Sequence, residues 1–146
     1  MSDPTEHTEN AVSVLVVDDD SEMTDLLTTV LGDAGYQVTA ASGPEEAMDL
    51  IRAHPPELVV TDLSMPTASG LDLVQAARDD MPALHFIVLT AFGDWPSFCR
   101  AQDLKVDRYL SKPVAMDRLL DEVAAVLATP VPSPSSLNPP KEENPC

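Results

Sequence analysis

The chain has 146 residues, with 25 Asp and Glu against 8 Lys and Arg, and a formal charge of −17. That length fits one domain with a sizeable core, and the charge excludes a nucleic-acid-binding surface or docking on an anionic membrane. The two cysteines, Cys99 and Cys146, have no C-x-x-C spacing, which gives no support to a zinc–thiolate site or a disulfide framework. Because cysteines are few and the first ten residues lack the pattern of a signal peptide, we expect a cytoplasmic protein.

Short apolar runs alternate with amphipathic stretches along the middle of the chain. The runs predict strands and the stretches predict helices. In chain order we expect a strand at 13–17, a helix from Ser21 to Ala34 stopped by Gly35, a strand at 37–41, a helix opening at Ser42-Gly43-Pro44, a strand at 58–62, a helix at 71–80, a strand at 85–90, a weaker helix from near Asp94, a strand at 108–111 and a helix at 116–127. Apolar strands separated by helices imply a parallel sheet covered on both faces, in an α/β fold.

The two ends of the chain differ from this middle part. Residues 1–11 carry acidic side chains and no basic ones, and six of the 14 prolines fall within residues 130–146. Neither end has enough large aliphatic residues to offset the entropy lost on ordering. We therefore expect a disordered acidic tail over 1–11, one folded domain over 12–128 and a proline-rich tail or linker over 129–146.

Polar side chains stand at the carboxyl ends of the predicted strands, where ligands bind in open α/β sheets. They are Asp18, Asp19 and Asp20 after the first strand, Asp62 at the third, Thr90 at the fourth and Lys112 after the fifth. Carboxylates this close repel one another unless a cation lies among them, and oxygen donors favour Mg²⁺ or Ca²⁺ over zinc. A carboxylate beside a cation, a lysine and a threonine suits a phosphoryl group.

Four segments resemble the receiver domain of two-component response regulators, the CheY-like family. They are LVVDDDSEM, VVTDLSMPTASGLDL, FIVLTA and RYLSKP, and they occur in the order and spacing of that family. The resemblance covers about residues 12–128. It implies a flavodoxin-like, doubly wound sheet of five parallel strands in the order 2-1-3-4-5, with helices on both faces.

The resemblance also implies a metal site and a phosphoacceptor. Asp62 would take a phosphoryl group from a phosphohistidine of a histidine kinase and form an aspartyl phosphate. Mg²⁺ would be held by Asp18, Asp19, Asp62 and the backbone carbonyl of Ser64. Lys112 would pair with a phosphoryl oxygen, and the peptide between Lys112 and Pro113 is typically cis.

The switch and the partners follow from the same resemblance. Thr90 would move to hydrogen-bond the phosphoryl group and draw Tyr109 inward. The face made by the fourth helix, the fifth strand and the fifth helix would then signal to an output domain or a downstream protein, or form a phosphorylation-dependent homodimer. The upstream partner would be a sensor histidine kinase or a phosphotransfer protein. The chain would be a signalling phosphoacceptor whose only chemistry is self-phosphorylation and autodephosphorylation, not an enzyme.

Two other functions fit parts of the pattern. Asp18 and Asp20, spaced D-x-D after a strand, also suit a haloacid-dehalogenase-like phosphohydrolase, although that class needs a further acidic motif and a longer chain. Asp20 has a simpler role as a helix cap, which Ser21 could equally fill. A receiver that is never phosphorylated and serves only for docking is the third hypothesis.

The segment before the fifth strand departs from the family pattern. Leu104-Lys105-Val106 stands where the family often has Ala-Gly-Ala. A left-handed Lys105 would cost about 1 kcal/mol relative to glycine. Pro96 lies near the start of the preceding helix, which has a poor apolar stripe. We therefore expect that helix to be the least stable or the most altered element of the fold.

Overall fold

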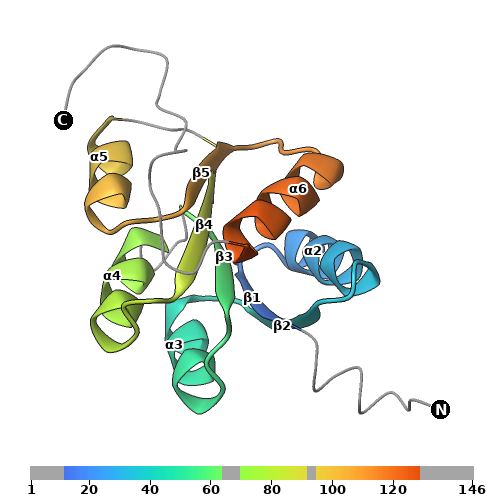
Figure 1. The fold of residues 1–146 in the computed structure, drawn as a ribbon, viewed down its shortest axis with the longest axis horizontal. Helices are drawn as coiled ribbons and strands as arrows, with labels where there is room; N and C mark the ends of the chain where they lie inside the picture. The colour runs from blue at the N-terminus through green and yellow to red at the C-terminus, as the bar shows by residue number, and fades with distance from the viewer. Residues whose placement is uncertain (1–11, 64–69, 92–94, 129–146) are drawn as a thin grey trace.

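Strands and helices alternate along the computed structural model, which describes residues 12–63, 70–91 and 95–128 (Figure 1). The elements are β1 (Ser13–Val17), α2 (Ser21–Asp33), β2 (Gln37–Ala41), α3 (Pro44–Ala53), β3 (Leu58–Asp62), α4 (Gly70–Asp80), β4 (His85–Thr90), α5 (Trp95–Asp103), β5 (Arg108–Ser111) and α6 (Met116–Leu127). All five strands lie at the predicted positions, and the helix bounds agree within about a residue or two, the usual uncertainty of helix ends.

The strands form one parallel sheet in the order β2-β1-β3-β4-β5. The predicted flavodoxin-like arrangement is confirmed. The strand order reverses between β1 and β3, because the chain first adds β2 on one side of β1 and then β3 on the other. The carboxyl ends of β1 and β3 therefore border the crevice in which such sheets bind ligands.

Helices cover both faces of the sheet, as Figure 1 shows, with α2 and α6 on one side and α3, α4 and α5 on the other. Successive strand residues point to opposite faces. In β1, Val14 and Val16 belong to the core shared with α2 and α6, whereas Leu15 and Val17 belong to the core shared with the other three helices. This alternation explains why the central strands are nearly continuous apolar runs and do not alternate between apolar and polar residues.

Local signals set several helix ends. The carboxylate of Asp20 accepts a hydrogen bond from the backbone N–H of Glu22 at 3.0 Å and caps α2. Pro44 opens α3, where its fixed φ suits a first helical residue. Gly35 follows α2 with a φ of 103°, and Lys105 follows α5 with a φ of 60°. The left-handed conformation expected for Lys105 is therefore present.

Cys99 of α5 is disulfide-bonded, a bond that the spacing of the two cysteines did not predict. Within α5, Phe98 and Ala101 are buried. None of the helices in the described part of the chain is both long enough and apolar enough to span a membrane.

Candidate functional site

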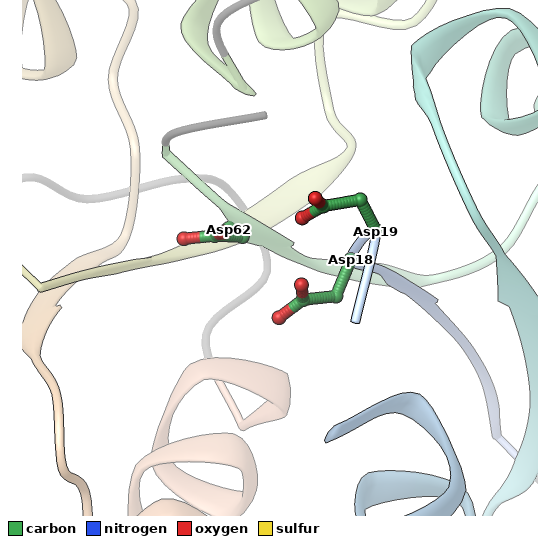
Figure 2. Close-up of side chains that lie close together, drawn as sticks. All are labelled: Asp18, Asp19 and Asp62. Carbon is green, nitrogen blue, oxygen red and sulfur yellow. The ribbon is translucent and has the colours of Figure 1, made fainter. Parts of the chain in front are cut away.

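Three carboxylates converge at the carboxyl edge of the sheet. Asp18 and Asp19 follow β1, and Asp62 is the last residue of β3, which pairs with β1 in parallel register. One carboxylate oxygen from each of the three lies within 4.8 Å of the others, and Figure 2 shows the three side chains close together. Asp18 and Asp62 are buried, with 3% and 8% exposed, whereas Asp19 faces solvent. The cluster is thus open to the solution on the Asp19 side.

Lys112, the residue that follows β5, brings a positive charge into this cluster. Its Nζ lies 3.3 Å from Oδ2 of Asp18 and 3.3 Å from Oδ1 of Asp62. The lysine is anchored through its backbone, because its N–H donates a 2.7 Å hydrogen bond to the carbonyl oxygen of Thr90. The peptide between Lys112 and Pro113 is cis, as the sequence resemblance implied. One ammonium group therefore bridges two carboxylates, one directly after β1 and one at the end of β3.

The electrostatics of the cluster favour an additional cation. Burial raises the pKa of Asp18 above its ordinary value, and the nearby charge of Asp62 acts in the same direction, while the Asp20 N–H and the Lys112 ammonium oppose both. Burial alone would lower the pKa of Lys112, but the carboxylates of Asp18 and Asp62 outweigh it and raise that pKa. Lys112 therefore stays charged, yet one ammonium cannot neutralise three carboxylates.

The donor set fits Mg²⁺. All three candidate ligand groups are carboxylates, which are hard oxygen donors, and Mg²⁺ is usually held by one or two carboxylates with waters completing its shell. Three carboxylates and one ammonium leave two negative charges in excess, which a divalent cation balances. The fourth ligand implied by the sequence resemblance, the carbonyl of Ser64, lies outside the described residues.

Asp20 is separate from this cluster. Its carboxylate accepts from the N–H of Glu22, and its own N–H donates to Oδ1 of Asp18 at 3.0 Å. Among the described residues, the potential metal-binding group contains Asp18, Asp19 and Asp62 and omits Asp20. The helix-cap interpretation of Asp20 is confirmed, and the geometry does not support a phosphohydrolase that uses Asp18 and Asp20 as a pair.

The two predicted switch residues lie on neighbouring strands. Thr90 ends β4 and is fully buried, and Tyr109 of β5 is opposite Val88, two residues before Thr90. Tyr109 is 2% exposed and its ring meets that of Phe98 edge to face, with centroids 5.5 Å apart. Tyr109 and Thr90 thus share the face covered by α5, with Tyr109 in the inward position.

Sequence reasoning missed one residue that contacts the site. Gly70 begins α4, and an added Cβ there would come within 2.3 Å of the carbonyl oxygen of Asp62. In the sequence Gly70 lies within VVTDLSMPTASGLDL, one of the segments that resemble the receiver family, but no role was assigned to it. Its place in that segment, eight residues after Asp62 and at the start of the following amphipathic stretch, was the available signal.

A doubly wound parallel sheet with an acidic cluster and a lysine at its switch point defines a class of α/β phosphoryl-binding proteins. Comparison with known families narrows this class. The family model described as "Response regulator receiver domain" matches residues 14–124. The chain belongs to that family: it contains a response regulator receiver domain.

Similar proteins agree with this assignment. The response regulator MprA of Mycolicibacterium vanbaalenii is 36% identical over 121 residues, which cover 83% of this chain and 52% of that protein. The response regulator protein PilR of Pseudomonas aeruginosa is 34% identical over 113 residues, or 77% of this chain and 25% of PilR. The chain thus spans about half or less of the length of these curated relatives.

Solved structures share the fold. A CheY-like response regulator receiver domain protein from Methanospirillum hungatei matches with a TM-score of 0.80 and 25% identity, covering 82% of this chain and 95% of that chain. A putative response regulator from Chloroflexus aurantiacus matches with a TM-score of 0.76 and 30% identity, covering 82% of this chain and all of the other.

Proposed function

We propose that this receiver domain accepts a phosphoryl group on Asp62 in a Mg²⁺-dependent reaction. The observation that carries the proposal is the position of the Asp62 carboxylate, 3.3 Å from the Lys112 ammonium and beside the carboxylates of Asp18 and Asp19. Phosphorylation of an aspartate is the general mechanism of the family. Asp62 ends β3, and its carboxylate lies beside both the Lys112 ammonium and the carboxylates of Asp18 and Asp19.

Each residue of the cluster has its own role in the proposed phosphoryl transfer. An oxygen of the Asp62 carboxylate attacks phosphorus while the bond between phosphorus and the donor's histidine nitrogen breaks; the acyl phosphate forms and the imidazole nitrogen keeps the electron pair. Lys112 is positioned to neutralise a phosphoryl oxygen. Asp18, Asp19 and Asp62 would hold Mg²⁺, which when bound neutralises phosphoryl oxygens as a Lewis acid.

Thr90 and Tyr109 carry the response to phosphorylation in this proposal. The Thr90 hydroxyl would hydrogen-bond the phosphoryl group, and Tyr109, on the same face of the sheet, would follow this movement. Tyr109 is already inward in this structure, packed edge to face against Phe98 of α5, so phosphorylation would hold it in that position. The changed surface would be that of α5, β5 and α6.

The proposed function also includes the partners of the domain and its location in the cell. The receiver unit spans 12–128, receives its phosphoryl group from a sensor histidine kinase or a phosphotransfer protein, and acts in the cytoplasm. It signals to an output domain or a downstream protein, with a phosphorylation-dependent homodimer as one form of output. It is a phosphoacceptor and not an enzyme that turns over an external substrate. These partners are proposed because the chain belongs to the receiver-domain family, whose members interact with kinases and output domains.

One experiment tests the assignment of Asp62. The protein is incubated with Mg²⁺ and acetyl phosphate, and its intact mass is followed over time. We expect one phosphoryl adduct that needs Mg²⁺ and is lost in Asp62→Asn. Absence of an adduct in the wild-type protein contradicts the proposal and favours a docking-only receiver.

Asp20→Asn is the matched control. Asparagine caps a helix as well as aspartate does, so this variant keeps the cap of α2 while removing the charge of Asp20. We expect it to be phosphorylated like the wild type. Steady release of phosphate that depends on Asp20 would instead support the phosphohydrolase.

A further inference from the structure

Gly70 packs against the backbone of the proposed phosphoacceptor. A Cβ atom added to Gly70 would lie 2.3 Å from the carbonyl oxygen of Asp62, 3.1 Å from its carbonyl carbon and 3.1 Å from Oγ1 of Thr61. The first of these distances is far shorter than van der Waals contact. Because the atom is part of the backbone of a central strand, it cannot move aside as the end of a flexible side chain would.

Glycine is required at this position for space and not for its backbone angles. Among the described residues, positive φ values occur at Gly35 and Lys105. Gly70 therefore has a conformation that other residues adopt without strain. The close approach of α4 to β3 is the physical reason why no side chain fits there.

Hydrogen bonds on both sides hold the same stretch of backbone in place. The N–H of Gly70 donates to the carbonyl oxygen of Leu63 at 2.8 Å, and the N–H of Leu63 donates to the carbonyl oxygen of Leu89 on β4 at 2.7 Å. The peptide that follows Asp62 is thus fixed between α4 and β4. The Asp62 side chain projects from this fixed backbone toward Lys112.

We infer that Gly70 is a positioning residue for phosphoryl transfer. The missing side chain lets the first turn of α4 rest on the Asp62 carbonyl, and that contact sets the direction of the Asp62 carboxylate. The inference rests on the proposed role of Asp62 as phosphoacceptor. An alanine at position 70 must either lift α4 from β3 or rotate the peptide after Asp62, and each moves the carboxylate relative to Lys112.

Gly70→Ala tests this role, with Gly32→Ala as the matched control. Gly32 lies in α2, and an added Cβ there meets nothing within 4 Å. Both variants are incubated with Mg²⁺ and increasing acetyl phosphate, at a temperature at which circular dichroism shows them folded. Displacements of about 1 Å can slow a reaction about 100-fold, so we expect the maximal rate of Gly70→Ala to fall at least about tenfold. Gly32→Ala should stay within about twofold of the wild type.

The maximal phosphorylation rate and the half-saturating acetyl phosphate concentration together separate a positioning role of Gly70 from a purely structural one. A positioning role lowers the maximal phosphorylation rate of the folded protein and changes the half-saturating acetyl phosphate concentration less than about twofold. A structural role lowers the melting temperature and leaves that maximal rate unchanged. A folded Gly70→Ala protein with the wild-type maximal rate overturns the inference. A wild-type protein that takes no phosphoryl group overturns the proposed function instead.

Two further measurements apply if Gly70→Ala does not fold. The double variant Gly32→Ala/Gly70→Ala should regain part of the lost stability, because alanine is a better helix former than glycine, here in the last turn of α2. In the wild-type protein, the amide resonance of Gly70 should shift on phosphorylation, while that of Gly32 stays in place. A Gly70 amide that does not shift when Asp62 is phosphorylated contradicts the inference.

Discussion

The Nζ atom of Lys112 lies 3.3 Å from Oδ1 of Asp62, and both side chains are mostly buried, with 21% and 10% exposed. The same nitrogen is 3.3 Å from Oδ2 of Asp18. Since a buried charge without a partner is costly, the two carboxylates depend on this single ammonium group when no other cation is near. The pair therefore links the stability of the fold to the chemistry proposed for Asp62.

Lys112→Met removes the ammonium and keeps the length of the side chain. We expect the metal-free protein to lose about 2 kcal/mol of its free energy of unfolding, because two carboxylates then lack a partner. Added Mg²⁺ should raise the melting temperature more in this variant than in the wild type. Phosphorylation by acetyl phosphate should slow by about 100-fold, since a positive charge near the phosphoryl oxygen is lost.

Lys105→Met is the control for Lys112→Met. Lys105 is an exposed lysine in the turn after α5, outside the acidic cluster. Its removal should leave the response to Mg²⁺ and the phosphorylation rate as they are in the wild type. Equal Mg²⁺ responses in the wild type and Lys112→Met would contradict the assigned role of Lys112.

Asp18→Asn should stabilise the metal-free protein. Burial raises the pKa of Asp18, so the folded state binds a proton more tightly than the unfolded state does. The stability linked to this group is present below the unfolded pKa and is lost as the pH rises through the folded pKa. Near pH 7 in EDTA, Asp18→Asn should therefore melt a few degrees higher than the wild type.

The higher melting temperature expected for Asp18→Asn depends on the pH and on the absence of Mg²⁺. The difference should shrink as the pH falls toward the raised pKa of Asp18, because the wild-type carboxyl group then becomes protonated. With Mg²⁺ present the order should reverse, since the variant lacks one of the three carboxylates that would hold the ion. Thermal melting in EDTA and in Mg²⁺ measures both effects, and a variant that is less stable in EDTA would disprove the argument.

Arg78 of α4 fixes the C-terminal end of α5. Its guanidinium group donates to the carbonyl oxygens of Leu104 at 3.1 Å and Lys105 at 3.2 Å, and on the other side to those of Pro82 at 2.8 Å and Leu84. Burial lowers the pKa of Arg78, although the nearby charge of Asp107 opposes this. One arginine thus joins the turn before β5 to the turn before β4.

Arg78→Lys keeps a positive charge but cannot reproduce the forked hydrogen bonds. We expect it to destabilise the protein by about 2 kcal/mol, because carbonyl groups near Leu104 and Leu84 lose their donors. Hydrogen exchange should speed up at the C-terminal end of α5 and in the turn that follows. Arg52→Lys is the control, because Arg52 forms an exposed 3.6 Å ion pair with Asp80, and such pairs contribute at most about 1 kcal/mol.

The same hydrogen-exchange experiment tests the prediction that α5 is the least stable helix. Wild-type α5 should exchange fastest of the five helices, since it is the shortest, with nine residues, and has Pro96 in its first turn. If α5 proves to be the best-protected helix, the prediction is wrong.

The fold was predictable because its signals are local. Runs of β-branched and other apolar residues set the strand bounds, and Gly35 and Pro44 mark helix ends. Parallel strands place their carboxyl ends at one edge, and the strand order implied by the family resemblance puts β1 beside β3, so the meeting of Asp18 with Asp62 could be predicted. Local signals did not distinguish Asp19 from Asp20, which are adjacent; the family resemblance placed Asp19 at the metal site, and the backbone geometry makes Asp20 a helix cap.

Contacts that depend on the spacing between packed helices and strands had no local signal in the sequence. The steric need for glycine at position 70 arises from the short distance between α4 and β3, which only the packed structure shows. The side chain of Arg78 reaches carbonyl groups 26 and 27 residues away. His85 lies 3.2 Å from Asp107, 22 residues further on, and both are buried. Such pairings appear only when the packed structure is known.

Lys105→Gly should stabilise the protein. Lys105 has a φ of 60°, a left-handed conformation that costs a residue with a Cβ roughly 1 kcal/mol relative to glycine. Glycine also gains more backbone freedom in the unfolded state, so the net increase in the free energy of unfolding should be somewhat below about 1 kcal/mol. The carbonyl of residue 105 remains available to Arg78 in the variant.

Lys105→Ala separates the backbone effect from the loss of charge. Alanine removes the ammonium group but keeps the Cβ, so it should leave the strain at φ 60° in place. Urea unfolding of the wild type and both variants gives the comparison. The glycine variant should be the more stable of the two by somewhat less than about 1 kcal/mol; if alanine stabilises as much as glycine, the gain comes from charge and the strain argument fails.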